Sequence, residues 1–280
     1  MAKTIGVINK IIRFSAVDGP GNRAAIFLQG CNYRCTYCHN PETIARCIHC
    51  GMCVEGCPVQ ALQMKQGKVI WNEAICVGCD ACIKTCPHLS SPKITFLTAE
   101  QVFETIGSGM YFIRGITVSG GEATLQRDFL IELFQRAHEK KLTALIDSNG
   151  SYDFKSDPAL LAVTDAVMLD VKAMDENEHR QLTGQGNQAV IRNVSFLAEQ
   201  KKLYEVRTVI APNSFHAEET VRAVARMIAP YPDVRYKLIA YRPFGVRKPY
   251  DAQIAMPTED DMQRMQTIAY NEGVRDVVLT

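Results

Sequence analysis

All 11 cysteines of this 280-residue chain lie between Cys31 and Cys86. An odd number of cysteines cannot pair completely into disulfides. The first residues, "MAKTIGVINKIIRF", lack the continuous apolar stretch and the cleavage site of a signal peptide. We therefore expect a cytoplasmic protein whose thiols stay reduced. Clustered, reduced cysteines at regular spacing are typical of metal ligands.

Eight of these cysteines form two runs, "CIHCGMCVEGCP" and "CVGCDACIKTCP". Both read C-x2-C-x2-C-x3-C-P, the bacterial ferredoxin pattern, in which the fourth cysteine binds the other [4Fe–4S] cluster. The first predicted cluster therefore has the ligands Cys47, Cys50, Cys53 and Cys86. The second has the ligands Cys57, Cys76, Cys79 and Cys82. The stretch between the runs, "ALQMKQGKVIWNEA", is expected to form a short hairpin.

Structural zinc is the alternative for these two runs, because pairs of C-x2-C cysteines also bind Zn²⁺. Two complete ferredoxin runs, each with its proline, are a much more specific pattern than paired zinc knuckles. We therefore favour iron–sulfur clusters.

The remaining cysteines, Cys31, Cys35 and Cys38, lie in "GCNYRCTYCHN" with the spacing C-x3-C-x2-C. The two ferredoxin runs leave no cysteine to serve as a fourth ligand. One interpretation is a zinc site of three cysteines completed by His39 or His49. The other is a four-iron cluster in which one iron has no protein ligand. Such open positions are where metal sites carry out chemistry.

The C-x3-C-x2-C spacing followed by histidine resembles the radical S-adenosylmethionine (SAM) superfamily. Residues 18–41, "DGPGNRAAIFLQGCNYRCTYCHNP", resemble a narrower family, the activating enzymes of glycyl-radical enzymes. So do "SGGEAT", "LIDSNG" and "VMLDVK" further along the chain. These motifs follow in family order and span nearly the whole chain. The ferredoxin runs fit the subset with two additional clusters, and the chain is most similar to the YjjW-type activating enzyme.

This resemblance implies an oxidoreductase that activates a partner glycyl-radical enzyme. A [4Fe–4S] cluster on the three-cysteine loop would bind SAM and cleave it reductively. The resulting 5′-deoxyadenosyl radical would abstract hydrogen from a glycine Cα of the partner. A one-electron donor such as flavodoxin or ferredoxin is implied as a second partner. No acid–base residue is required, because the cofactor supplies the chemistry.

Three alternatives stay open. The chain could be a radical SAM enzyme that acts on a small molecule, although "DGPG" before the cysteine loop argues against this. It could instead be a non-catalytic ferredoxin-type electron-transfer protein. A zinc-bound interaction protein is the third alternative.

The resemblance also implies which residues contact SAM. They are Tyr37, Cys38, His39, Gly121, Asp147, Asp170, Val171, Lys172 and Arg242. From the residues alone, "SGGE" could be an ordinary turn, Asp170 and Lys172 a mutual or cross-strand ion pair, and Asp147 a turn residue. Arg242 departs from the family, in which a histidine often stands at this place. A guanidinium cannot give up its proton, so the role of Arg242 stays open.

Alternating apolar segments predict an α/β fold with a mostly parallel sheet. Strands are expected at 24–29, 115–119, 142–148, 166–171, 204–211, 234–241 and 274–279. Helices are expected at 98–106, with a capping box of Thr98 and Gln101, and at 128–141, 189–202, 216–229 and from about 258. The periodicity of apolar residues does not distinguish an open parallel sheet from a barrel. The resemblance implies a partial (β/α)6 barrel, residues 1–40 and 93–280, with a ferredoxin-like insert at 41–92.

The net charge and the hydropathy argue against a nucleic-acid partner and against a membrane-spanning segment. The formal net charge of +1 gives no electrostatic reason to expect nucleic acid. No run of about 18 apolar residues exists, so we expect no membrane-spanning segment.

Overall fold

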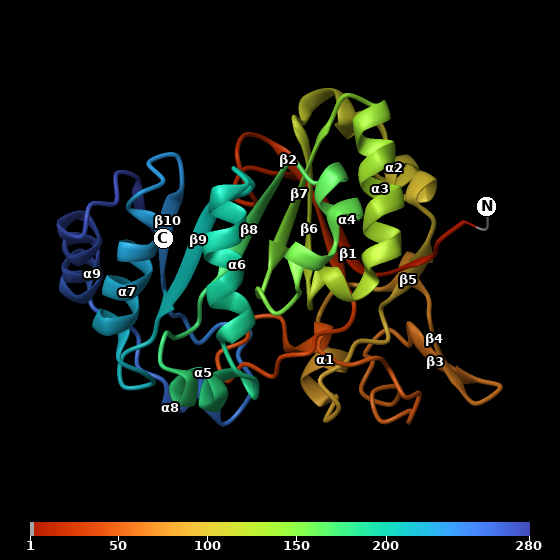
Figure 1. The fold of residues 1–280 in the computed structure, drawn as a ribbon. Coiled ribbons are helices and arrows are strands. Elements are labelled where there is room, and N and C mark those ends of the chain that lie inside the picture. Colours follow the sequence, from red (N-terminus) through yellow and green to blue (C-terminus); the bar gives the residue numbers. More distant parts are fainter. Residues whose placement is uncertain (1–2) are drawn as a thin grey trace.

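The computed structural model describes residues 3–280. In chain order, the strands of its main sheet are β1 (Gly6–Ser15), β2 (Arg23–Leu28), β5 (Thr95–Leu97), β6 (Gly115–Gly120), β7 (Thr143–Ser148), β8 (Ala166–Asp170), β9 (Leu203–Ile210), β10 (Arg235–Ala240) and β11 (Val277–Leu279). Among the described residues this is a nine-stranded sheet in the order β11-β10-β9-β8-β7-β6-β2-β1-β5 (Figure 1). The strands from β2 to β11 are parallel, whereas β1 is antiparallel to both neighbours.

The helices that follow these strands are α2 (Ala99–Ile106), α3 (Arg127–Glu139), α4 (Pro158–Val163), α5 (Glu176–Thr183), α6 (Gln188–Glu199), α7 (Ala217–Ile228), α8 (Tyr250–Gln253) and α9 (Glu259–Asn271). Short 3-10 segments are η1 (Pro41–Thr43), η2 (Glu73–Ile75), η3 (Gly107–Phe112), η4 (Ala123–Gln126) and η5 (Phe154–Ser156). Within residues 3–280, none of these helices is both long and apolar enough to cross a bilayer.

Local sequence signals explain where the helices begin. Thr98 accepts a hydrogen bond from the Gln101 main-chain nitrogen, and the Gln101 side chain returns to Thr98, which confirms the predicted capping box. Thr258 and Asp261 form the same arrangement at the start of α9. The helix predicted at 128–141 is confirmed as α3, whose apolar stripe has five buried positions, namely Phe129, Leu130, Leu133, Phe134 and Ala137.

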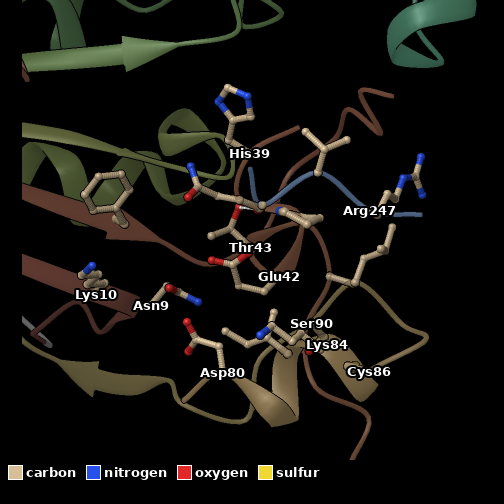
Figure 2. A pocket seen from close by; sticks show the side chains of 18 of the residues that line it. Asn9, Lys10, His39, Glu42, Thr43, Asp80, Lys84, Cys86, Ser90 and Arg247 are labelled. Carbon is tan, nitrogen blue, oxygen red and sulfur yellow. Dashed lines mark hydrogen bonds between the residues drawn. The ribbon is translucent and has the colours of Figure 1, made fainter. Parts of the chain in front are cut away.

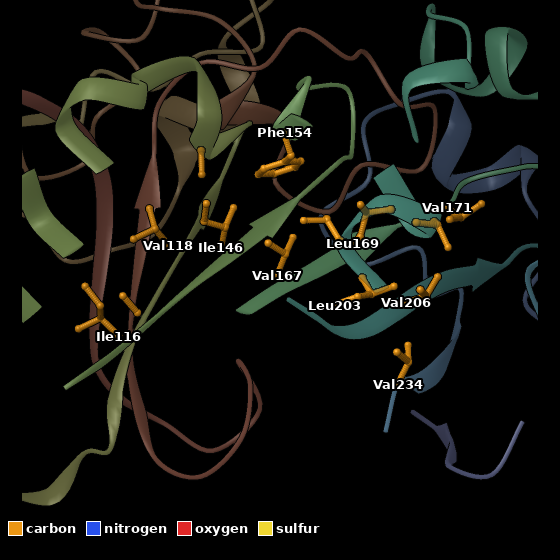
Figure 3. Packing of buried hydrophobic residues seen from close by; sticks show 14 of the residues in the cluster. Ile116, Val118, Ile146, Phe154, Val167, Leu169, Val171, Leu203, Val206 and Val234 are labelled. Carbon is orange, nitrogen blue, oxygen red and sulfur yellow. The ribbon is translucent and has the colours of Figure 1, made fainter. Parts of the chain in front are cut away.

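The two faces of the parallel sheet carry different residues because successive side chains of a strand point to opposite sides. On the face covered by helices, Ile116, Val118, Ile146, Val167 and Leu169 are completely buried (Figure 3). The opposite, concave face carries polar and charged side chains. The functional residues described below lie on that concave face.

The predicted α/β fold is confirmed, and each predicted strand begins and ends within three residues of an observed one. Six connections link the seven parallel strands, and β5 and β11 form the two edges of the sheet, so the barrel is open. The main difference is β1, which the sequence did not predict. It precedes the segment expected to be the first strand and lies between β2 and β5.

The cysteine-rich segment leaves the sheet after β2 and returns at β5. It contains the antiparallel hairpin of β3 (Leu62–Lys65) and β4 (Lys68–Trp71), which confirms the hairpin predicted between the two cysteine runs. It also contains the short helix α1 (Ala81–Thr85). In the view of Figure 1, α1 and the β3–β4 hairpin lie below the β1 and β5 side of the main sheet.

Candidate functional site at the carboxyl ends of the parallel strands

The three-cysteine loop begins directly after β2. Main-chain hydrogen bonds hold both its flanks. The Cys31 nitrogen donates to the Ile44 carbonyl oxygen at 2.9 Å. The Arg34 nitrogen donates to the Thr183 oxygen at the end of α5, also at 2.9 Å. The loop is therefore fixed between the returning chain and α5.

Burial affects the thiols of this loop. It raises the pKa of Cys31 to about 12 and that of Cys35 to about 11. A metal that binds these sulfurs must displace their protons. The Cys31 sulfur also accepts hydrogen bonds from the Tyr33 main chain at 3.4 Å and from Asn149 Nδ2 at 3.8 Å.

Neither histidine considered as a fourth ligand joins the three cysteines. His39 Nε2 lies 2.9 Å from the Arg242 carbonyl oxygen, and since a carbonyl only accepts, this nitrogen carries a proton. His49 Nδ1 accepts from the Val69 nitrogen at 3.2 Å and lies 3.8 Å from the Cys47 sulfur. Among residues 3–280, no three His, Cys, Asp or Glu side chains gather as they would around a single metal ion.

Gly121 lies beside this loop at the end of β6. Its nitrogen donates to the Leu28 carbonyl oxygen at 3.0 Å. A Cβ at this position would lie 2.0 Å from the Gly30 carbonyl oxygen and 2.9 Å from that of Thr43. Only glycine therefore allows β6 to approach the cysteine loop this closely.

Glu122, the next residue, is fully engaged with the protein. Its carboxylate accepts from Thr124 Oγ1 at 2.7 Å, from Ser148 Oγ at 3.0 Å and from the Asn149 nitrogen at 2.7 Å. The side chain is 1% exposed. Burial raises the pKa of Glu122, although these hydrogen bonds oppose the rise. Glu122 thus links the turns after β6 and β7.

Asp170 and Lys172 point to the same side at the end of β8 and form a mutual ion pair of 2.7 Å. The Lys172 nitrogen also lies 5.7 Å from the centre of the Tyr37 ring. Burial opposes the charge of Lys172, but Asp170 and Tyr37 raise its pKa above the ordinary value. Val171 points the other way and packs in the hydrophobic core, so only its main chain is on the site's side.

Asp147 belongs to a buried charge network that the sequence reading missed. Its carboxylate lies 3.0 Å from Arg207 Nη1 and accepts from Ser119 Oγ at 2.9 Å. Arg207 also donates to Glu205 at 2.5 Å, and its Nη2 lies 2.9 Å from the Met168 sulfur. The sequence does contain a signal for this network. Glu205 and Arg207 are two residues apart in an otherwise apolar strand, so their side chains lie on the same face of the sheet.

His39 and Arg242 meet through the main chain. The His39 ring stacks near Tyr241, with centroids 6.3 Å apart, and burial lowers the pKa of His39. The Arg242 side chain is exposed, and only its carbonyl oxygen contacts His39. The structure therefore brings His39, but not the Arg242 guanidinium, together with the other predicted residues.

A cavity of about 1710 Å³ opens beside the site. Asp147 and Ser119 line it from the parallel strands, and Asn9 and Lys10 line it from β1. Residues of the cysteine-rich segment and of the loop at 243–248 complete the wall. Figure 2 shows His39 and Arg247 on one side of this cavity, and Asp80, Lys84 and Cys86 on another.

The cysteines of the two ferredoxin runs line two small pockets. One pocket is lined by four cysteines, Cys47, Cys50, Cys53 and Cys86. The other is lined by Cys57, Cys76, Cys79 and Cys82. These are the two sets expected from crossed ligation. Each pocket presents four sulfur donors, so the residues present fit a cysteine-held iron–sulfur cluster.

Several polar atoms around the three-cysteine loop have no partner. The hydroxyl groups of Tyr33, Tyr37 and Tyr241 are buried without a hydrogen bond within the described residues. Buried polar atoms are normally paired, so unpaired ones need an explanation such as water or a bound molecule. These hydroxyls, with the three thiols, fit a polar ligand beside the loop.

Comparisons with known proteins agree with this arrangement. The protein family described as "4Fe-4S single cluster domain" matches residues 17–191. The isethionate sulfite-lyase activating enzyme of Oleidesulfovibrio alaskensis is 31% identical over 88% of this chain and 86% of its own. The (2S)-3-sulfopropanediol sulfolyase activating enzyme of Bilophila wadsworthia is 30% identical over 87% of both chains. The pyruvate formate-lyase-activating enzyme of Streptococcus mutans is 29% identical over 96% of this chain and 93% of its own.

Solved structures share the fold. QueE from Escherichia coli superimposes with a TM-score of 0.57 at 13% identity, covering 99% of this chain and 94% of QueE. A radical SAM methyltransferase from Sphaerobacter thermophilus gives a TM-score of 0.53 at 12% identity, covering 98% of this chain and 73% of its own. At such low identity the likeness concerns the fold alone.

Proposed function

This chain belongs to the family of glycyl-radical enzyme activating enzymes, and from that membership we propose which of its residues hold the cofactors and receive the partner. Its reaction is radical SAM chemistry directed at a glycyl-radical enzyme. The observation that carries the proposal is the position of Cys31, Cys35 and Cys38. They follow β2 at the carboxyl ends of the parallel strands, where α/β folds bind ligands.

We assign the catalytic [4Fe–4S] cluster to these three cysteines, which leaves one iron free for SAM. When bound, the cluster supplies the electron that cleaves SAM and so generates the radical that attacks the glycine. The protein's own residues position and shield the cofactors. Glu122 and Asn149 hold the turn that contacts the Cys31 sulfur. The buried rings of Tyr33 and Tyr37 lie in the same loop as the half-buried thiols.

We propose that SAM lies against the residues gathered around this loop. They are Tyr37, Cys38, His39, Gly121, Asp147, Asp170, Val171 and Lys172. The ion pair of Asp170 and Lys172 offers both charges to a ligand that itself carries an amino group and a carboxylate. Val171 would contribute through its main chain. The Arg242 side chain is exposed, so it would have to turn inward to contact SAM.

For the cysteine-rich insert we propose two further [4Fe–4S] clusters with crossed ligation. The four-cysteine composition of each small pocket supports this assignment. It would put the chain in the subset of activating enzymes with two additional clusters, nearest the YjjW type. The corresponding division of the chain is a barrel of residues 1–40 and 93–280 with an insert at 41–92.

The partners are a glycyl-radical enzyme, as the protein substrate, and a one-electron donor such as flavodoxin or ferredoxin. A glycine inside a folded enzyme is reachable only if its loop leaves that enzyme and enters the activating protein. The cavity beside Asp147 and His39 is large enough for a segment of extended chain. Glycine suits such a loop because it adopts backbone angles that other residues avoid.

Anaerobic reconstitution tests the cofactor assignment. We expect about 12 irons per chain, from three four-iron clusters. Replacing Cys31, Cys35 and Cys38 by alanine should remove one cluster and all SAM cleavage, while the insert clusters remain. Saturation near eight irons in the unchanged protein, or loading with zinc, would contradict the assignment. So would 5′-deoxyadenosine formation by the triple variant.

A further inference from the structure

The cysteine-rich insert is joined to the three-cysteine loop by a short main-chain route. The Cys31 nitrogen donates to the Ile44 oxygen at 2.9 Å. The adjacent Ala45 nitrogen donates to the Leu89 oxygen, also at 2.9 Å. Ala45 and Ser90 form an isolated parallel β-bridge. Two hydrogen bonds thus connect the loop after β2, the chain leaving it, and the chain returning from the insert.

Both arms of this route end on the same set of cysteines. From Ala45 the chain reaches Cys47 after one intervening residue. From Leu89 it runs back through two residues to Cys86. Cys47 and Cys86 line the same pocket, together with Cys50 and Cys53. We call these four cysteines the first set, and Cys57, Cys76, Cys79 and Cys82 the second set. Within residues 3–280, no hydrogen bond joins the second set or its flanking residues to segment 28–45.

Buried side chains hold the route in place. Gln29 is 1% exposed, and its Nε2 donates to the Glu42 oxygen at 2.7 Å and to the Ala45 oxygen at 2.5 Å. Its Oε1 accepts from Asn9 at 2.8 Å. Figure 2 shows Glu42 and Ser90 among the residues that line the cavity. This clamp fixes segment 42–45, which carries the Ile44 acceptor and the Ala45 donor of the route.

We propose that segments 42–47 and 86–90, which we call the bridge, conduct electrons from the first set of cysteines into the three-cysteine loop. All electrons then reach the three-cysteine loop from the cluster of the first set. Electrons that enter at the second set pass through the first set on their way. Electron tunnelling falls steeply with distance and is faster through covalent and hydrogen bonds than through gaps, so the shorter bonded route prevails. The proposal rests on the cofactor assignment made above.

The electron balance is simple. Each SAM molecule that is cleaved consumes one electron, supplied by a reduced flavodoxin- or ferredoxin-type protein, which is left oxidised by one electron. The residues of the bridge are neither oxidised nor reduced. A small reductant can reach the loop through the open cavity, so it does not need the bridge.

The test compares two reductants in four variants of the full-length, reconstituted protein. C50S/C53S disrupts the first set and C76S/C79S the second. Gln29→Leu removes the clamp on segment 42–45 but keeps all 11 cysteines. Asn9→Ala is the matched control, because it removes the hydrogen bond to the Gln29 side-chain oxygen and leaves the clamp intact. Reduced flavodoxin and dithionite serve as the two electron sources.

Electron paramagnetic resonance of the reduced protein supplies a readout that is independent of activity. We expect the magnetic coupling between the loop cluster and the insert to be lost in C50S/C53S and retained in C76S/C79S. Reduction of the loop cluster by flavodoxin should be lost in C50S/C53S and slowed in Gln29→Leu, but unchanged in Asn9→Ala. Dithionite should reduce the loop cluster in every variant.

Two results would overturn the bridge. One is reduction by flavodoxin at the wild-type rate in both C50S/C53S and Gln29→Leu. The other is loss of coupling on removal of the second set but not of the first. If dithionite and SAM gave no cleavage even in the unchanged protein, the proposed function itself would fail. The two failures are therefore distinguishable.

Discussion

The Glu122 carboxylate accepts a hydrogen bond from the Asn149 main-chain nitrogen at 2.7 Å, and the Asn149 side chain donates to the Cys31 sulfur at 3.8 Å. Three loops, after β2, β6 and β7, are thereby tied together at one end of the parallel sheet. Glu122 acts through Asn149 and is a positioning residue. This network fixes the turns that surround the Cys31 thiol.

Glu122→Gln should destabilise the protein. The amide nitrogen cannot accept a hydrogen bond, so at least one buried donor loses its partner, at a cost of about 1–3 kcal/mol. The measurement is the urea midpoint of the anaerobically purified protein. Glu139→Gln, at an exposed position of α3, is the control and should leave the midpoint unchanged. Equal midpoints for the two variants would contradict the role given to Glu122.

Gly121→Ala should separate β6 from the cysteine loop. The new Cβ meets two main-chain oxygens, and such overpacking costs about 1–3 kcal/mol or more. We expect weaker SAM binding by calorimetry together with a lower melting temperature. Gly56→Ala is the matched control, because a Cβ there meets its nearest neighbour at 3.7 Å, an ordinary contact. Wild-type SAM affinity in Gly121→Ala would show that the close approach is unimportant.

His179→Phe should loosen the cysteine loop. His179 is completely buried, its Nδ1 donates to the Gln185 carbonyl oxygen at 2.9 Å, and its ring lies edge-on to Tyr33 at 5.6 Å. Phenylalanine keeps the ring contact but loses the hydrogen bond that fixes the turn after α5. The Leu182 and Thr183 oxygens beside this turn accept hydrogen bonds from the cysteine loop. We expect faster loss of the loop cluster, measured as bound iron after repeated desalting. The control is His138→Phe, on the exposed side of α3, which should retain iron like the unchanged protein. Equally fast loss of iron in both variants would contradict a specific role of His179.

Arg207→Met should be strongly destabilising and dependent on pH. It leaves Asp147 buried without its cation, and Glu205 with only the more distant Arg235 at 3.9 Å. Breaking a buried pair costs about 3–5 kcal/mol. Burial already raises the pKa of Asp147, and the Arg207 charge opposes that rise. Without Arg207 the pKa should rise further above its unfolded value. A carboxyl with a raised pKa binds a proton on folding, so the deficit should shrink as the pH falls from 8 towards 6.

Urea midpoints across this pH range check the prediction for Arg207→Met. Replacing Glu205 by glutamine in the same chain removes one of the stranded charges and should restore part of the loss. A deficit that grew as the pH fell would contradict the sign of the effect.

Much of the fold followed from the sequence because its signals are local. The apolar stripe of α3, the Thr98 capping box and the apolar strands each depend on neighbouring residues, and the structure confirms them. The strand β1 was missed because Lys10, Arg13 and Phe14 are exposed, which breaks the pattern of a buried strand. Its place is set by pairing with β2 and β5, which no local pattern reveals.

For the candidate site, too, the sequence predicted some features and missed others. The cysteine spacing predicted the two four-cysteine sets, and the members of each set line one pocket. The resemblance indicated the residues around the loop. Neither revealed that Arg207 pairs with Asp147, or that Glu122 is committed to Asn149. Those contacts join residues far apart in the sequence, and they exist only once the strands are adjacent in the sheet.

The central claim is that this protein places a radical on a glycine of another protein. Electron paramagnetic resonance after incubation with SAM, a one-electron donor and the partner glycyl-radical enzyme tests it most directly. We predict a stable doublet signal on the partner, whose large splitting disappears when the partner is prepared with Cα-deuterated glycine. Vigorous SAM cleavage with no radical on the partner, coupled instead to consumption of a small metabolite, would contradict the claim.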